Sequence, residues 1–142
     1  MKGFVVYMDD NRGDCYHCHG SAGNPLWTDG EFHNNALNNS FSGVDQGRFL
    51  ITGNPADMGK FRTPTLRNIA LTAPYMHDNR FATLTEVINF YSSGLQQSAT
   101  VDPLMTHINQ GGAQLSASDK ADLLAFLRTL TDSTFINNPA FY

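Results

Sequence analysis

The 142-residue chain has few charges, only two cysteines and no long apolar run. Charged residues make up 15% of the sequence, and 9 basic against 13 acidic side chains give a net charge of −4. Because the basic residues form no cluster, the composition argues against nucleic acid and an electrostatic membrane surface as partners. The apolar run that begins at Phe4 ends within a few residues, which is too short for a membrane span or a signal-peptide core.

The length indicates one domain, since domains typically contain ~100–200 residues. A domain of this size buries roughly two-thirds of the surface of its unfolded chain, so it needs no disulfide framework for stability. We expect the domain to cover residues 1–131 and a C-terminal tail to cover residues 132–142.

Both cysteines lie in one short segment, Cys15-Tyr16-His17-Cys18-His19. Cys-x-x-Cys-His is the attachment signature of a c-type haem. Two thiols at this spacing on a helical turn can each bond to one vinyl group of the same porphyrin. His19 then lies under the ring and can offer a nitrogen to the iron.

Three other interpretations of this segment account for less of it. A thioredoxin-like redox pair needs a strand before it and a longer helix after it, and the sequence shows neither. A zinc site normally draws on a second pair of ligands at a similar spacing, whereas His33, His77 and His107 are scattered singly. A disulfide between the two cysteines leaves His19 unexplained. The segment therefore predicts one covalently bound haem c.

Covalent attachment of haem c takes place outside the cytoplasm. We therefore expect a periplasmic or otherwise extracytoplasmic location. No export signal is recognisable in the sequence, and we expect the chain to derive from a longer precursor or a larger protein.

Capping signals and apolar spacing predict four helices. Thr63 followed by proline is a typical helix start, and Thr83 with Glu86 forms a capping box. Ser116 opens the segment with the clearest apolar period. The predicted helices cover residues 2–10, 64–70, 83–92 and 117–130.

The rest of the chain shows no sustained apolar period. Residues 20–55 are rich in glycine, asparagine, serine and aspartate, and residues 135–142 show no periodicity either. A loop as long as the first is uncommon in a domain that packs only against itself, but a large flat cofactor would supply the missing core. No strand pair is convincing. The sequence therefore predicts an all-α, cytochrome-c-like domain with long irregular loops wrapped around one covalently bound haem c.

The chemistry of such a haem depends on the ligand opposite His19. A neutral thioether raises the reduction potential and suits an electron carrier, a phenolate lowers it, and an empty face allows peroxide to bind. Composition alone does not rank the candidates, which are Met58, Met76, His77, Tyr91, Met105 and His107.

Four segments resemble the C-terminal haem domain of the bacterial dihaem cytochrome c peroxidases and of their relative MauG. They are Gly59–Asn68 (GKFRTPTLRN), Leu71–Asp78 (LTAPYMHD), Thr83–Val87 (TLTEV) and Leu115–Leu127 (LSASDKADLLAFL). The resemblance covers most of the chain, as far as Thr131. Family members carry two haems in two cytochrome-c-like domains, and this chain resembles only the second.

The resemblance implies that Tyr91 is the second iron ligand. It occupies a position where peroxidases of the family usually have methionine and MauG-like members have tyrosine. Met76 is the alternative, by analogy with small monohaem cytochromes.

The same resemblance implies a function in electron transfer. The domain would relay electrons to or from a second, peroxide-reactive haem, carried by another domain or chain of the same hydrogen peroxide-dependent oxidoreductase, with a redox partner protein besides. Because only one haem motif is present, this chain alone is not expected to turn over peroxide. The alternative is a free-standing monohaem c-type electron carrier.

Further residues are expected around the cofactor. The backbone carbonyl of Pro25 can accept a hydrogen bond from the free ring nitrogen of His19, which would fix the imidazole orientation. Arg62 and Arg67 suit the haem propionates, with surface salt bridges as the alternative. His33 is expected to face solvent.

Calcium is implied by the resemblance alone. In the family, a calcium ion lies between the two domains and is held partly by backbone carbonyls of a Thr-x-Pro segment. That segment is Thr72-Ala73-Pro74 here, so Thr72 and Pro74 are the implied ligands. The remaining family ligand comes from the other domain.

Overall fold

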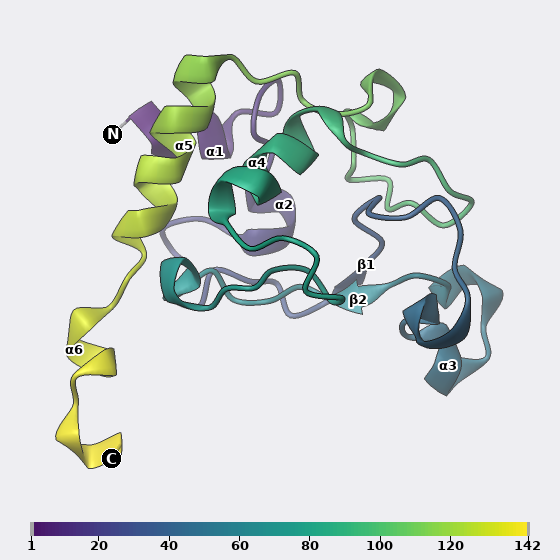
Figure 1. Cartoon of the computed structure of the whole chain (residues 1–142), viewed down its shortest axis with the longest axis horizontal. Helices are drawn as coiled ribbons and strands as arrows, with labels where there is room; N and C mark the ends of the chain where they lie inside the picture. The colour runs from purple at the N-terminus through teal and green to yellow at the C-terminus, as the bar shows by residue number, and fades with distance from the viewer. Residues whose placement is uncertain (1, 142) are drawn as a thin grey trace.

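The computed structural model describes residues 2–141, so the parts of the predicted domain and tail that fall on Met1 and Tyr142 lie outside the described residues. The fold is helix-rich with little sheet (Figure 1). Within residues 2–141, no helix combines the length and the apolar character that crossing a lipid bilayer requires. The elements include α1 (Lys2–Met8), α2 (Tyr16–His19), β1 (Phe32–His33), α3 (Phe49–Thr52), β2 (Phe61–Arg62), α4 (Leu84–Ser93), α5 (Ala117–Thr129) and α6 (Ser133–Ile136).

Helices α4 and α5 begin at the capping boxes that the sequence predicts. The Glu86 N–H donates to the Thr83 hydroxyl at 3.2 Å, and the Glu86 carboxylate accepts the Thr83 N–H at 2.8 Å. Ser116 and Asp119 exchange the same pair of bonds at 3.1 and 3.3 Å. These bonds satisfy backbone groups that a helix start leaves unpaired. The two predicted helices are thereby confirmed.

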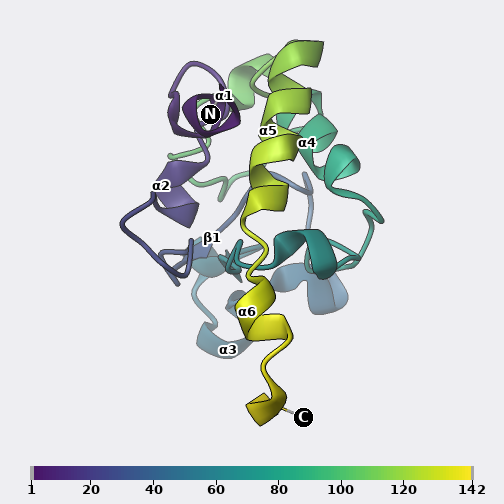
Figure 2. The ribbon, with the colours of Figure 1, turned by 90° about the vertical axis from the view of Figure 1, so that its left-hand side faces the viewer.

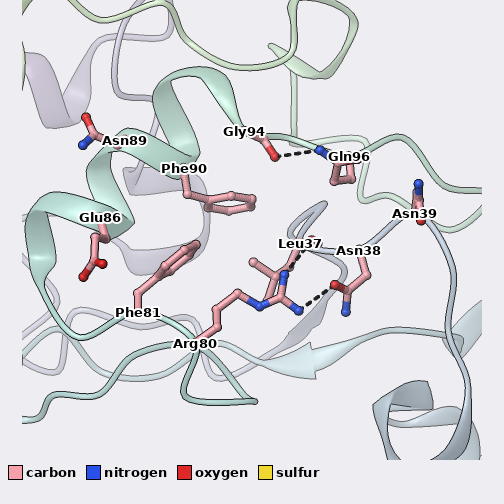
Figure 3. Close-up of a pocket in the computed structure, with 10 residues that line it drawn as sticks. All are labelled: Leu37, Asn38, Asn39, Arg80, Phe81, Glu86, Asn89, Phe90, Gly94 and Gln96. Atoms are coloured by element: carbon pink, nitrogen blue, oxygen red, sulfur yellow. Dashed lines mark hydrogen bonds between the residues drawn. The ribbon is translucent and has the colours of Figure 1, made fainter.

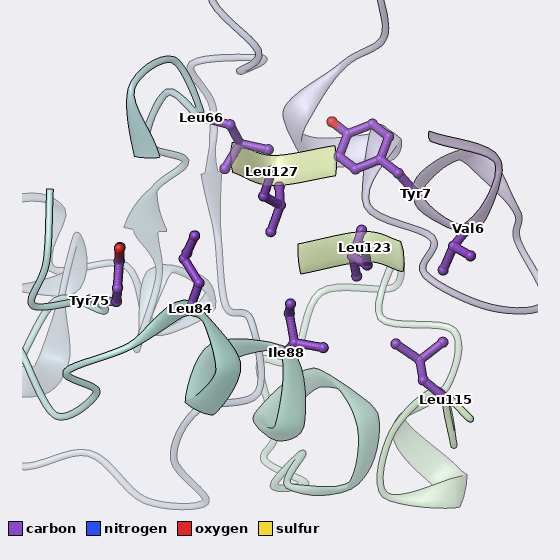
Figure 4. Close-up of a cluster of buried hydrophobic side chains, with 9 residues drawn as sticks. All are labelled: Val6, Tyr7, Leu66, Tyr75, Leu84, Ile88, Leu115, Leu123 and Leu127. Atoms are coloured by element: carbon purple, nitrogen blue, oxygen red, sulfur yellow. The ribbon is translucent and has the colours of Figure 1, made fainter. Parts of the chain in front are cut away.

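A hydrophobic core joins α1, α4 and α5. In Figure 2, α5 runs between α1 and α4, and it contacts both. The first helix is confirmed, although it ends at Met8 rather than at residue 10. Gly3 permits its close approach to α5, because a Cβ atom there would lie 1.9 Å from the Asp122 carbonyl oxygen. The buried side chains of this core are Val6, Tyr7, Leu66, Tyr75, Leu84, Ile88, Leu115, Leu123 and Leu127 (Figure 4).

The prediction of a helix that starts at Thr63 is wrong. The Thr63 N–H donates to the Glu31 carbonyl at 2.9 Å, and the Leu66 N–H donates to the Trp27 carbonyl at 3.2 Å. This backbone pairing with an earlier loop replaces the helical bonds, and only a 3₁₀ turn forms afterwards, at Ile69–Leu71. Bonds between distant segments here outweigh a local helix-start signal.

A short antiparallel ladder joins β1 and β2, although the sequence analysis found no convincing strand pair. Phe32 pairs with Arg62, and His33 pairs with Phe61. Each strand has only 2 residues, whereas alternation becomes recognisable over about 4–8 residues. The ladder ties the loop after the cysteine motif to the segment that carries Thr63.

Beyond α5 the chain forms α6 and a 3₁₀ turn at Pro139–Phe141, where the sequence showed no periodicity. The Asp132 carboxylate accepts the Phe135 N–H at 2.9 Å and so caps α6. It also accepts a hydrogen bond from the Arg67 guanidinium at 2.6 Å. In Figures 1 and 2 this tail continues past the end of α5, away from the helical core.

Candidate functional site

The cysteine motif forms α2 and is anchored to the helical core by one tyrosine. The His19 N–H donates to the Cys15 carbonyl at 3.1 Å and closes a single helical turn. The Cys15 N–H donates to the Tyr7 carbonyl at 3.0 Å, and the Tyr7 hydroxyl donates to the Gly20 carbonyl at 2.7 Å. Because Tyr7 is 0% exposed, both ends of the motif are fixed to the core.

Cys15 and Cys18 do not form a disulfide with one another. Burial, followed by the negative charge of Asp14, raises the pKa of Cys15 to about 12. Burial, followed by the charge of Asp29, raises the pKa of Cys18 to about 12. A thioredoxin-like pair needs a thiol with a lowered pKa, because the thiolate is the reactive form. The raised pKa values do not favour the thiolate on which thiol–disulfide exchange depends.

His19 presents a neutral imidazole beside the two thiols. Burial lowers its pKa to about 4, and the backbone of Trp27 and of Pro64 acts in the opposite direction. Its Nδ1 atom is buried and makes no hydrogen bond within residues 2–141. The bond predicted from His19 to the Pro25 carbonyl is therefore not formed. The chain turns at Trp27, whose φ is 52°, and the backbone that acts on the ring belongs to Trp27 and Pro64 instead.

His33 does not face solvent as predicted, because both of its ring nitrogens are bonded to carboxylates. Nδ1 lies 2.6 Å from Asp102 and Nε2 lies 2.9 Å from Asp29, and the side chain is only 15% exposed. Burial acts to lower the pKa of His33, but the hydrogen bonds to Asp102 and Asp29 raise it above its ordinary value. Although Cys18, Asp29 and His33 lie close enough to share a metal ion, this histidine has no nitrogen left to offer one.

Tyr91 on α4 and Met76 in the preceding loop meet at Asn35. The Asn35 Nδ2 donates to the Tyr91 oxygen at 3.0 Å and lies 3.7 Å from the Met76 sulfur. Removal from water raises the pKa of Tyr91 to about 12, while the bond from Asn35 acts to lower it. Cys15 and Cys18 contribute further to the raised pKa. The structure thus brings together two of the predicted second ligands.

The other candidates for the second ligand have different surroundings. The His77 side chain is only 15% exposed: its Nε2 lies 3.3 Å from Asp45, and its ring stacks on that of Phe61 with the ring centroids 3.7 Å apart. Met58 and Met105 are half-buried. His107 is half-buried as well, and its Nε2 atom is buried without a hydrogen-bond partner in the described part of the chain.

The two arginines predicted for the propionates differ. Arg67 forms an ion pair with Asp132 at 2.6 Å, so its guanidinium follows the salt-bridge alternative. Arg62 is exposed and donates from Nε to the Gly30 carbonyl at 3.0 Å. Its remaining N–H groups keep it a candidate for a carboxylate ligand.

Thr72 and Pro74 lie in an exposed loop after the 3₁₀ turn Ile69–Leu71. The Thr72 hydroxyl donates to the Ile69 carbonyl at 3.2 Å. Within residues 2–141, the groups of His, Cys, Asp and Glu with metal-ligand spacing lie elsewhere, in the loop around α2 and at β1.

A separate pocket of about 570 Å³ lies beside α4 (Figure 3). Its lining includes Phe90 and Arg80 but neither the cysteine motif nor Tyr91. The centroids of the Phe90 and Tyr91 rings are 4.9 Å apart, so the pocket adjoins the candidate ligand through Phe90. The Arg80 guanidinium is already bonded to Asp78 and Asn38 at 2.7 Å each.

The residues around the motif fit a covalently attached haem. Cys15 and Cys18 are spaced by one helical turn, and burial lowers the pKa of the adjoining His19, which favours the neutral imidazole that binds iron. The buried Nδ1 of His19, which has no hydrogen-bond partner in the described residues, adds an unpaired polar atom to the site.

Comparison with known proteins agrees with this chemistry. The chain matches no protein-family model. It is 33% identical over 155 residues to the cytochrome-c peroxidase IdrP2 of Denitromonas iodatirespirans, a match that covers 91% of this chain and 38% of that protein. It is 32% identical over 131 residues to the methylamine utilization protein MauG of Methylophilus methylotrophus, covering 91% of this chain and 36% of that protein. The chain thus spans less than half the length of these relatives.

Solved structures give the same result. A MauG-like protein associated with microbial copper homeostasis superposes with a TM-score of 0.81 at 42% identity, covering 99% of this chain and 49% of that one. The diheme peroxidase BthA from Burkholderia thailandensis shares the fold, with a TM-score of 0.73 at 24% identity. The chain therefore belongs to the family of the bacterial dihaem cytochrome c peroxidases and MauG, which implies haem c as its cofactor.

Proposed function

We propose that the chain is the C-terminal, electron-transfer haem c domain of a dihaem peroxidase or MauG-like oxidoreductase. It relays electrons to or from a second, peroxide-reactive haem in another domain or chain. The observation that carries the proposal is the geometry of the motif: Cys15, Cys18 and His19 share one helical turn, which the His19 N–H closes by donating to the Cys15 carbonyl at 3.1 Å. Membership of a dihaem family supports it.

Haem c, when bound, supplies a one-electron redox centre. Cys15 and Cys18 hold it through thioether bonds, and His19 offers a ring nitrogen to the iron. Tyr7 fixes this motif to the helical core by two hydrogen bonds, so the ligand does not depend on a mobile loop for its position. The long loops would enclose the ring and exclude water, and Arg62 would pair with a propionate.

Tyr91 is the proposed second ligand. Its oxygen is held by Asn35, and tyrosine occupies the position that the family resemblance implies. A phenolate donates negative charge to the iron and lowers the reduction potential. Met76 is the alternative ligand because its sulfur contacts the same asparagine.

Tyr91→Phe tests this ligand, because it removes the oxygen and keeps the ring. We expect the low-spin electron paramagnetic resonance spectrum of the ferric, haem-loaded protein to change while the haem stays covalently attached. Met76→Leu is the matched control and is expected to leave the spectrum unchanged. The reverse pattern, a changed spectrum only in Met76→Leu, would rule out Tyr91 as the ligand.

That reverse pattern would instead favour a second function, a free-standing monohaem electron carrier. The observation behind it is the position of the Met76 sulfur beside Tyr91. A thioether ligand gives a high reduction potential, which suits a carrier. A redox titration therefore separates the two functions, since the tyrosine-ligated domain has the lower potential.

The proposal extends to the partners, the calcium site and the location of the domain. A redox partner protein exchanges electrons with it, and the second haem is carried by another domain or chain. Thr72 and Pro74 contribute backbone oxygens to a calcium ion shared with that domain, since calcium prefers oxygen ligands. The location is periplasmic or otherwise extracytoplasmic, where haem c is attached.

A further inference from the structure

One asparagine touches both candidates for the second ligand. The Nδ2 atom of Asn35 lies 3.0 Å from the Tyr91 oxygen and 3.7 Å from the Met76 sulfur. A primary amide carries two hydrogens on this nitrogen, so it can donate to an oxygen and a sulfur at the same time. Asn35 was not among the residues that the sequence analysis singled out.

The backbone around Asn35 is fixed by its neighbour. Asn34 is 1% exposed, and its amide nitrogen donates to the hydroxyls of Ser98 and Thr100 at 3.1 and 3.0 Å. Its side-chain oxygen accepts the Ala36 N–H at 3.0 Å. Because a buried polar group that is fully bonded is costly to displace, the amide of Asn35 is presented from a rigid support.

Two backbone bonds extend this support. The Asp102 N–H donates to the Asn34 carbonyl at 3.1 Å, and the Gln96 N–H donates to the Ala36 carbonyl at 2.8 Å. Ala36 itself is 0% exposed and has a φ of 62°. The segment that carries Asn35 is therefore bonded on both sides to the chain that follows α4, the helix of Tyr91.

We propose that Asn35 is a positioning residue for the Tyr91 ligand, fixing the direction of its oxygen and drawing electron density away from it. The inference rests on the proposed function, in which Tyr91 binds the iron. Groups that hydrogen-bond to a metal ligand orient it and tune the metal. The second N–H of the amide holds the Met76 sulfur in place beside the oxygen.

The sign of the effect follows from the chemistry of the bond. An N–H donor takes up part of the negative charge of a ligand oxygen, so the oxygen donates less to the iron. Without this donor, the oxygen donates more, the ferric state is favoured, and the midpoint potential falls. The oxygen also loses its fixed direction, which broadens or splits the spectrum of the ferric centre.

Asn35→Leu tests the inference in the haem-loaded protein, because leucine has a similar size and no N–H group. We expect a negative shift of the midpoint potential and a changed low-spin electron paramagnetic resonance spectrum. Asn39→Leu is the matched control, an exposed asparagine in the same loop, and we expect wild-type values for it. If Asn35→Leu does not fold, Asn35→Ser serves instead, since its side chain is too short to reach Tyr91.

A double variant distinguishes positioning from a general structural role. In a Tyr91→Phe background, Asn35→Leu should cause no further spectral change, because the two residues act through one oxygen. An equal change in both backgrounds would overturn the inference, as would a wild-type spectrum and potential in the single variant. If Tyr91→Phe alone leaves the spectrum unchanged, Tyr91 is not the ligand, and the proposed ligand fails together with the inference. If Tyr91→Phe changes the spectrum and Asn35→Leu does not, only the inference about Asn35 fails.

Discussion

The helical side and the loop side of the molecule are stabilised in different ways. The helical side, made of α1, α4 and α5, buries aliphatic side chains such as Leu123 and Leu127, which are 4% and 8% exposed. In the loop side, defined here as residues 28–37 with residues 95–102, the most deeply buried polar side chain is Asn34, which joins the two segments by side-chain bonds.

The two sides therefore differ in how strongly they depend on directional interactions. Apolar packing is non-directional, so the helical side needs only side chains of suitable size and spacing. A buried amide is stable only with partners in the right place, so each bond of the loop side depends on the others. Under the proposed function, the haem adds the apolar centre that the loop side lacks.

The largest effect is expected for a Cys15→Ser/Cys18→Ser double variant. Without thiols no thioether bond forms, so haem staining of the denatured protein should be lost completely. Because the helical side has its own core, hydrogen exchange should stay slow in α5 and become fast in the loop side. Stained denatured protein, or equal loss of protection on both sides, would contradict the account.

Leu127→Ala tests the helical side by itself. Removing a buried leucine side chain should lower the free energy of unfolding by about 2–5 kcal/mol, measured by urea denaturation. Ala125→Ser, at an exposed position of the same helix, should change it by less than about 0.5 kcal/mol. A cost for Leu127→Ala no larger than that of the control would show that α5 does not carry the core.

Asn34→Ala is the corresponding test of the loop side. It leaves the Ala36 N–H and two hydroxyls without their partner, which should cost about 1–3 kcal/mol in urea denaturation. Asn39→Ala, an exposed asparagine of the same loop, serves as control and should be nearly neutral. If the two variants were equally stable, the polar bonds of Asn34 would not hold the loop side together.

His33 gives the smallest effect, and this effect depends on pH. Its pKa is raised in the folded state by Asp102 and Asp29, against the influence of burial. The stabilisation is therefore complete below the unfolded pKa of about 6.5 and is lost as the pH rises through the folded pKa.

The matching variant is His33→Asn. The measured quantity is the unfolding free energy of wild type minus that of the variant. This difference should be larger at low pH than at high pH by about 0.2–1 kcal/mol, as is typical of partly exposed charge pairs. Denaturation curves measured between about pH 5 and pH 9 follow this difference. The pH range is chosen to extend to both sides of the reference pKa of histidine. A difference that stays constant, or that grows with pH, would contradict the raised pKa.

The sequence predicted the helical side well, because α4 and α5 carry both caps and an apolar period within one segment. It failed at Thr63, where the same local signals were present. There, backbone bonds to Glu31 and Trp27 decide the conformation, and such partners lie more than 30 residues away in the sequence, beyond any local pattern.

The candidate site shows the same division. Cys15, Cys18 and His19 form a contiguous motif with a known chemistry, so the sequence sufficed to select them. The positions of Asn35 and His33 depend on bonds to Tyr91 and Asp102, which only the folded chain reveals. An Asn-Asn pair in a polar loop is no signal of such a role by itself.

Under the proposed function, haem is covalently attached at Cys15 and Cys18. The most direct measurement is the absorption spectrum of the full chain, produced in a host that attaches haem c, after extraction with acidified acetone. We expect the haem absorption to stay with the protein, because the thioether bonds resist extraction. A colourless protein that is nevertheless fully folded would contradict it.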